Sequence, residues 1–252
     1  NISLVYNWYK DGTLNATNVF IDDSSLVAYY PLNNDTLDYA GEYDGTLAGD
    51  PTVTTGDGGI IGEAYSFTDD GINLGNSIQD FTNVTVSLWI KRTSDVGDQW
   101  AVAGLSQDMA TNRSFLFGLG GDPYGGSCGD GGTNKVLLEI GGDCVFFGSV
   151  APLDDWMYIV FTYNGSHYSA YEDGTFTESV AGSVLPSSTA PFYIGRRDFV
   201  SPDEGFFPGM IDEVQIYNRT LSQAEVSQLY YGSAYGGDVM NSSQTTVDDV
   251  WT

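Results

Sequence analysis

The feature that most constrains the fold is a series of short, apolar segments that end at glycine-containing turns. The segment from Trp156 to Tyr163 is rich in aromatic and β-branched residues and is followed by Asn164-Gly165. A second segment, Tyr168 to Glu172, ends at Asp173-Gly174. Asn-Gly and Asp-Gly suit hairpin turns because these residues tolerate positive φ angles. The stretch therefore predicts a three-stranded antiparallel meander.

The rest of the chain repeats this pattern and contains one convincing helix. Alternating apolar and polar residues predict strands at 84–90, 136–140 and 210–217. Residues 221–231 predict a helix, because Ser222 and Glu225 have capping-box spacing and Gly232 stands at the expected stop. There is no β-α-β rhythm. The fold class is therefore all-β, an antiparallel jelly-roll sandwich with one short C-terminal helix and extra β flanks.

The length of 252 residues suits one large all-β domain with short flanks. We place an N-terminal β flank at 1–23, the jelly roll at 24–232 and a C-terminal β flank at 233–252. The flanks contain WYKDG and DDVW, and neither is long enough to form a domain alone. They are predicted to pair with each other, with the central domain or with another chain.

The charge balance excludes two classes of partner. The chain has 34 acidic and 8 basic residues, for a net charge of −26. It lacks the cations needed to bind nucleic acid or an anionic membrane surface. It also has no run of roughly 20 apolar residues that could enter a membrane, and we expect no signal peptide within it. The acidity suits either a solvated surface or carboxylates gathered around calcium.

Asn-X-Ser/Thr sequons and cysteines both indicate an extracellular or cell-surface glycoprotein. The chain has more sequons than its Asn, Ser and Thr content would give by chance, although such a composition also creates some accidentally. Cys128 and Cys144 are the only cysteines and are predicted to form a disulfide, since His167 is the only histidine and a zinc site would need more ligands. The eight sequons start at Asn1, Asn15, Asn34, Asn83, Asn112, Asn164, Asn218 and Asn241.

Residues 26–231 resemble the laminin-G-like jelly roll of the concanavalin A-like lectin/glucanase superfamily. The resemblance lies in blocks that occur in the family's order over about four-fifths of the chain. The flanks are similar to halves of an immunoglobulin-like surface repeat. The blocks are LVAYYPL at 26–32, DYAG at 38–41, DGTL at 44–47, GEAYSF at 62–67, VTVSLWIK at 84–91, residues 156–174, FYIGR at 192–196 and FPGMIDEVQIYNRTLS at 207–222.

This resemblance implies a structural calcium ion held by Asp212, with Asp38 and Asp44 as the most favoured further ligands. Strand alternation predicts that Asp212 shares one face with Val214 and Ile216. A carboxylate among core residues needs a partner, which calcium and backbone carbonyls would supply. The alternative is that Asp212 caps backbone amides without a metal.

The superfamily includes glucanases, but the residues that their chemistry needs are not apparent. Retaining glycosidases use two carboxyl groups about 5–5.5 Å apart, which the glucanase relatives place as Glu-x-Asp-x-x-Glu on one strand. That spacing does not occur here. The adjacent pairs Asp69-Asp70 and Asp154-Asp155 are predicted to lie in turns, and His167 in a hairpin turn. We therefore expect no enzymatic activity.

Two functions remain open. The first is a structural or adhesive module of an extracellular surface protein, whose partners are copies of itself or neighbouring domains and whose terminal strands assemble a fibre or filament. The alternative is a lectin-like module that binds carbohydrate. In that case loop aromatics would stack on sugars, unless they fill the ends of the sandwich: Trp100, Tyr124, Phe199, Phe206 and Phe207.

Overall fold

The computed structural model describes most of the chain. The described residues are 3–10, 13–21, 24–56, 58–76, 78, 81–94, 98–104, 115–120, 134–140, 143–182, 191–196 and 206–234. At some of these positions the backbone alone is described: 3–10, 13–21, 98–104, 115–116, 120, 139–140 and 143–144.

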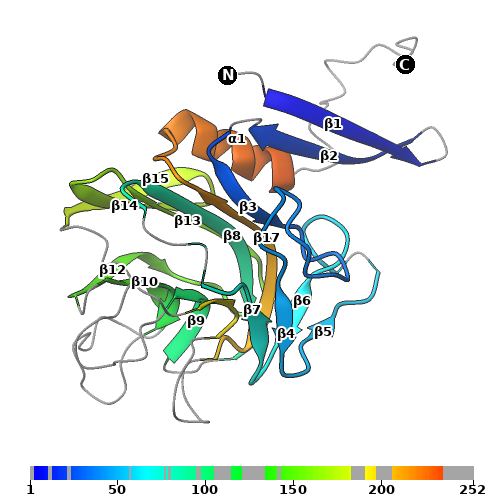
Figure 1. Cartoon of the computed structure of the whole chain (residues 1–252), viewed down its shortest axis with the longest axis horizontal. Coiled ribbons are helices and arrows are strands. Elements are labelled where there is room, and N and C mark those ends of the chain that lie inside the picture. The colour runs from blue at the N-terminus through cyan, green and yellow to red at the C-terminus, as the bar shows by residue number, and fades with distance from the viewer. Residues whose placement is uncertain are drawn as a thin grey trace.

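Two antiparallel sheets stack face to face in the part of the chain that the structure describes (Figure 1). The eight-stranded sheet has the order β15-β14-β13-β8-β17-β6-β5, with β3 also paired to β17. Its strands are β3 (Leu26–Tyr30), β5 (Thr52–Val53), β6 (Tyr65–Phe67), β8 (Val84–Arg92), β13 (Met157–Tyr163), β14 (His167–Glu172), β15 (Thr175–Ala181) and β17 (Gly209–Tyr217).

The seven-stranded sheet has the order β12-β11-β10-β9-β16-β7-β4. The jelly-roll prediction is confirmed by these two sheets, whose inner faces enclose one large apolar core. The strands of this second sheet are β4 (Thr46–Ala48), β7 (Gly71–Asn73), β9 (Asp98–Gly104), β10 (Phe115–Gly120), β11 (Lys135–Ile140), β12 (Asp143–Val150) and β16 (Phe192–Ile194).

The eight-stranded sheet is covered on both of its faces. Leu88 and Ile90 of β8 point into the core between the sheets. Trp89 of the same strand points the other way, into a smaller apolar cluster with Tyr158 and Leu229. Leu229 belongs to helix α1 (Gln223–Ala234), which lies across this outer face in Figure 1. Because both faces are covered, every residue of β13 is buried.

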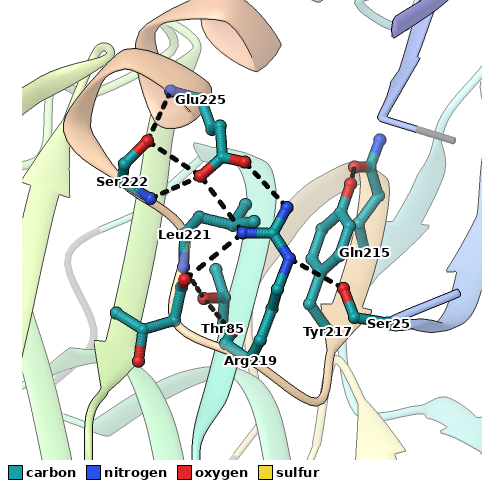
Figure 2. A network of polar contacts seen from close by, with 9 residues as sticks. Ser25, Thr85, Gln215, Tyr217, Arg219, Leu221, Ser222 and Glu225 are labelled. Atoms are coloured by element: carbon teal, nitrogen blue, oxygen red, sulfur yellow. Dashed lines mark hydrogen bonds and ion pairs between the residues drawn. The ribbon is translucent and has the colours of Figure 1, made fainter. Parts of the chain in front are cut away.

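A polar network fixes the start of α1 to the sheet (Figure 2). The Arg219 guanidinium donates to both carboxylate oxygens of Glu225 at 2.8 and 3.1 Å and through Nε to Ser25 Oγ at 2.9 Å. The predicted capping box forms, since Ser222 N donates to Glu225 Oε2 at 2.7 Å and Glu225 N to Ser222 Oγ at 3.4 Å. The hydrogen bonds from Arg219 hold the pKa of Glu225 at about 2.

The predicted meander is confirmed, with β14 paired to β13 on one side and to β15 on the other. Its turns use positive φ angles at Gly165, Asp173 and Gly174, as the Asn-Gly and Asp-Gly pairs indicate. One helix boundary was wrong. Gly232 lies inside α1, which continues to Ala234, and Ser233 Oγ accepts a hydrogen bond from Trp89 Nε1 at 2.9 Å in this extra turn.

The N-terminal flank forms a hairpin of its own. Strands β1 (Ser3–Lys10) and β2 (Thr13–Ile21) pair along their length as a two-stranded sheet. Strand β2 contacts α1, so the hairpin lies beyond the helix from the sandwich (Figure 1). The C-terminal flank lies outside the described residues from 235 onward, so its predicted pairing stays a prediction.

Candidate functional site

The outward face of the seven-stranded sheet carries a polar and aromatic cluster centred on Tyr193. Phe192 and Ile194 point into the core, so alternation along β16 places Tyr193 on the opposite face. Tyr193 pairs with Asn73 of the neighbouring strand β7. The Asn73 Nδ2 donates to the Tyr193 hydroxyl at 3.2 Å, while Asn73 Oδ1 accepts from Gly75 N at 2.8 Å.

Arg196 lies over two aromatic rings at the end of this strand pair. Its guanidinium carbon is 5.5 Å from the centroid of Tyr193 and 5.2 Å from that of Phe206, within the range of cation–π attraction. Gly71 makes room for this arrangement. A Cβ at Gly71 would clash with Arg196 Cγ and lie 2.7 Å from Ile194 O.

We call Asn73, Tyr193, Arg196 and Phe206 the β7–β16 face. Tyr193 is 8% exposed, so its ring mainly supports the others, and Asn73, Arg196 and Phe206 are half-buried. The face combines guanidinium donors, an amide and an aromatic edge within a small area. Such a mixture of apolar surface and convergent hydrogen-bonding groups suits a ligand rich in hydroxyls.

The loop aromatics expected from sequence have different positions. Phe206 is part of the β7–β16 face, as its predicted role requires. Phe207 is fully buried in the core between the sheets and cannot stack on a sugar. The two residues are neighbours in an extended segment, so they point in opposite directions. Trp100 lies in β9, where the backbone alone is described, and Tyr124 and Phe199 lie outside the described residues.

Asp38 organises the loop that follows β3. Its Oδ1 accepts from Tyr29 N and Ala40 N at 2.8 and 2.9 Å, and its Oδ2 accepts from Glu42 N and Tyr43 N, both at 3.1 Å. Asp44 belongs to the same loop, where its Oδ1 accepts from Asp38 N at 2.9 Å. The structure thus brings together two of the three predicted calcium ligands. Their carboxylate oxygens accept hydrogen bonds from backbone amides.

Asp212 does not share a face with Val214 and Ile216, contrary to the prediction. A β-bulge places Asp212 opposite Trp89 and Gln215 opposite Ser87, so β17 contains one extra residue here. The bulge lies at Glu213, whose φ is +53°. Val214 and Ile216 face the main core, whereas Asp212 accepts hydrogen bonds from Ile60, Ile61 and Glu213 amides at 2.7, 3.3 and 2.9 Å.

The bulge leaves two adjacent acids buried. Asp212 is fully buried and Glu213 is 4% exposed. Burial raises the pKa of Asp212 to about 8, against the three amides that favour its charged form. Burial and the neighbouring Asp212 also raise the pKa of Glu213. Tyr29 Oη donates to Glu213 Oε2 at 2.8 Å, but Glu213 Oε1 has no hydrogen-bond partner among the described residues, and such an unpaired buried oxygen costs about 1–3 kcal/mol.

The described residues give mixed support to a calcium site. None of their Asp, Glu, His or Cys side chains form a group of three that could hold a metal ion. The unpaired Glu213 Oε1 beside Asp212 is a feature that a hard cation would satisfy. Asp212 with Glu213 therefore fits a cation better than Asp38 with Asp44. Calcium stays a prediction.

The remaining sequence candidates lie mostly in turns or outside the described side chains. Asp69 and Asp70 lie between β6 and β7, and Asp154 and Asp155 before β13, as predicted for turn residues. His167 was predicted to lie in the hairpin turn, but it is the exposed first residue of β14, directly after the turn, with its Nδ1 2.9 Å from Ser166 Oγ. Cys128 lies outside the described residues and Cys144 is described by its backbone alone, so the disulfide stays a prediction.

The sequon asparagines divide in the same way. Asn34, Asn164 and Asn218 are exposed and Asn83 is half-buried. Asn15 lies in β2, where the backbone alone is described. Asn1, Asn112 and Asn241 lie outside the described residues.

Four residues of these sites were not expected from sequence: Asn73, Tyr193, Arg196 and Glu213. The alternation in Phe192–Ile194 was a usable signal for Tyr193, because a short apolar strand must expose its middle residue to the other face. No local signal identified Arg196 or Glu213. The position of Arg196 depends on Gly71 in a distant strand. The position of Glu213 depends on a bulge that contains no glycine or asparagine.

Two stacked antiparallel sheets with one covering helix define a β-sandwich of the jelly-roll class. The chain belongs to the concanavalin A-like lectin/glucanases superfamily, whose Laminin_G_3 family model matches residues 66–227. No curated protein matches the chain.

Solved structures with this fold include sugar-bound domains. Domain 4 of an extracellular arabinanase from Geobacillus stearothermophilus, in complex with arabinotriose, is 22% identical with a TM-score of 0.65, over 82% of this chain and 98% of that domain. A Trypanosoma rangeli sialidase is 13% identical with a TM-score of 0.61, over 89% of this chain and 35% of its own. The botulinum neurotoxin serotype D ligand-binding domain with N-acetylneuraminic acid is 18% identical with a TM-score of 0.58, over 82% and 51%.

We predict that the buried acids make the fold less stable as pH rises. Above about pH 5 the unfolded chain has released both protons, whereas the folded chain retains the Asp212 proton up to about pH 8 and holds the Glu213 proton beyond its usual range, so stability falls with rising pH. Replacing Glu213 with Gln should make this dependence shallower in urea unfolding with EDTA present. Glu178→Gln, an exposed change on β15, should leave it unchanged. Equal pH slopes for Glu213→Gln and the unaltered chain would contradict the prediction.

Calcium removal gives a separate prediction. A cation that binds only the folded chain raises its melting temperature, by an amount that grows with the logarithm of its concentration relative to Kd. Excess EDTA should therefore lower the melting temperature, and added calcium should restore it. Asp212→Asn should abolish the difference between the two conditions, whereas Asp44→Asn should preserve it. A melting temperature that EDTA leaves unchanged argues against bound calcium.

Proposed function

We propose that the chain is a non-catalytic carbohydrate-binding module of an extracellular protein. The observation that carries this proposal is the β7–β16 face, where Arg196 lies over the rings of Tyr193 and Phe206 and Asn73 donates to the Tyr193 hydroxyl. Carbohydrate recognition commonly combines planar polar side chains with an aromatic surface. Asn73 lies in β7, and Arg196 and Phe206 are paired by a β-bridge just beyond β16, so these groups are held in place before a ligand arrives.

Two further findings support this proposal. The similar domains include one solved with arabinotriose and one solved with N-acetylneuraminic acid. The arabinanase is extracellular, in keeping with the many sequons of this chain. Among the described residues, no helix is long and apolar enough to cross a membrane.

The non-catalytic part of the proposal is supported by the surroundings of the carboxylates. The most buried carboxylates among the described residues accept hydrogen bonds from backbone amides or from Tyr29; they are Asp38, Asp70, Asp212 and Glu213. The two adjacent Asp pairs lie in turns. A glycosidase instead needs two carboxyl groups that face one sugar across a fixed gap.

Removing side chains from the β7–β16 face should weaken sugar binding. Calorimetric titration with arabinotriose and with sialyllactose would follow a glycan array. For the sugar that binds, we expect Phe206→Ala and Arg196→Ala each to weaken affinity by about 10-fold or more, as for central residues of a binding site. Phe176→Ala, at an exposed aromatic on β15 of the other sheet, is the matched control. Unchanged affinity in both site variants would refute the assignment.

The β1–β2 hairpin favours a second candidate function, self-assembly into a fibre. The hairpin is a separate two-stranded sheet, and isolated two-stranded sheets are only marginally stable. Its outer edges offer backbone groups to a strand from another copy. A head-to-tail contact that does not close would repeat into a filament.

Deletion of residues 1–20 tests this second function. Electron microscopy of the intact chain should show filaments, and the deletion should disperse them while the circular dichroism of the jelly roll persists. The Phe206→Ala variant should still form filaments, which separates assembly from sugar binding. Dispersed particles of the intact chain would refute self-assembly.

A further inference from the structure

Three sequon asparagines lie at the ends of three adjacent strands. Strand β8 pairs with β13 on one side and with β17 on the other. Asn83 precedes β8, Asn164 follows β13 and Asn218 follows β17. The register pairs Val84 with Tyr163 and Thr85 with Tyr217, so all three asparagines lie at the same end of the sheet.

The three side chains are close enough to form one cluster. Neighbouring strands lie about 4.8 Å apart, so the outer two asparagines are roughly 10 Å from each other across Asn83. A Cβ placed on Gly165 would lie 3.6 Å from Asn83 Oδ1, which shows that the Asn83 amide borders the Asn164 turn. Asn34 is not part of this cluster, because β3 runs antiparallel to β17 and leads to the opposite end.

The sequon hydroxyls differ more than the asparagines do. Thr85, of the Asn83 sequon, is fully buried; its Oγ1 donates to Arg219 O at 2.8 Å and accepts from Leu221 N at 3.0 Å (Figure 2). Thr220, of the Asn218 sequon, donates to Tyr163 O at 2.8 Å. Ser166, of the Asn164 sequon, is exposed and its Oγ donates to Asn164 Oδ1 at 2.9 Å.

Two of the sequons are therefore interlocked by the fold. The Thr85 hydroxyl of the Asn83 sequon donates to Arg219, the middle residue of the Asn218 sequon. The Thr220 hydroxyl of the Asn218 sequon donates to Tyr163, the residue before Asn164. Glycosylation requires a hydroxyl at the third position, so the transferase must reach this group as well as the asparagine. Of these three sequons, the Asn164 sequon alone has its hydroxyl, that of Ser166, in an exposed turn of the folded chain.

We propose that Asn83, Asn164 and Asn218 carry N-linked glycans that together cover this end of the sandwich, and that Asn83 and Asn218 are modified before folding. In each transfer the Asn Nδ2 forms a bond to the anomeric carbon of a polyprenyl-phosphate-linked oligosaccharide. The bond from that carbon to the phosphate oxygen breaks, the polyprenyl phosphate leaves with the electron pair, and the amide proton passes to solvent. The covered end is then closed to protein partners, which leaves the β7–β16 face and the hairpin for contact.

The timing can be measured with an oligosaccharyltransferase and its lipid-linked oligosaccharide. The folded full chain, made without glycans, is compared with synthetic peptides of the three sequons, and mass spectrometry gives the occupancy at each site. Asn164 should be modified in the folded chain at a rate near that of its peptide. Asn83 and Asn218 should be modified at least about 10-fold more slowly than their peptides, because their hydroxyls become accessible only by local unfolding.

A second measurement tests occupancy itself. The full chain secreted from a glycosylating host should carry glycans at all three positions, and Asn83→Gln, Asn164→Gln and Asn218→Gln should each remove one. An unmodified trio in the secreted chain would overturn the proposal. So would modification of Asn83 and Asn218 in the folded chain at peptide rates, which would remove the order of events. Neither outcome depends on whether the β7–β16 face binds sugar.

Discussion

The double pairing of β8, with β13 on one side and β17 on the other, is the constraint on which the rest of the structure depends. These three strands form the centre of the eight-stranded sheet and are covered by the second sheet on one face and by α1 on the other. Their register sets the position of Thr85. The Thr85 hydroxyl bonds to Arg219 O and Leu221 N in the segment between β17 and α1. The same register aligns the three sequons, and it shifts by one residue at the Glu213 bulge. One strand therefore links the helix, the buried acids and the sheet end that carries Asn83, Asn164 and Asn218.

Much of the sandwich could be predicted from the sequence because its signals are local. Alternation identified β8 and β17, and Asn-Gly and Asp-Gly turns identified the meander that β13 begins. The capping box at Ser222 and Glu225 is equally local and formed as expected. Each of these features depends on residues a few positions apart. Such features survive folding when tertiary contacts agree with them.

The errors arise where distant residues decide the outcome. Alternation placed Asp212 with Val214 and Ile216, but an inserted residue reverses the direction of the strand's side chains. Glu213 adopts a positive φ that its residue type does not indicate. Phe206 and Phe207 are adjacent aromatics, and only the position of β16 and Arg196 decides which one reaches the surface. The helix continues past Gly232, and its last turn contains Ser233, which accepts a hydrogen bond from Trp89 of a distant strand.

In the loop after β3, the Asp38 side chain holds the backbone through hydrogen bonds that involve no other side chain of the loop. Four backbone amides converge on the two oxygens of Asp38, so the course of the loop is set by main-chain atoms that every residue except proline supplies. The outward side chains of Leu37 and Tyr39 take no part in these four bonds and are well exposed. The hydrogen bonds that determine the shape of the loop are thus separate from the side chains that form its surface. Substitutions at Leu37 and Tyr39 can therefore change the surface of the loop while the four hydrogen bonds to Asp38 are retained.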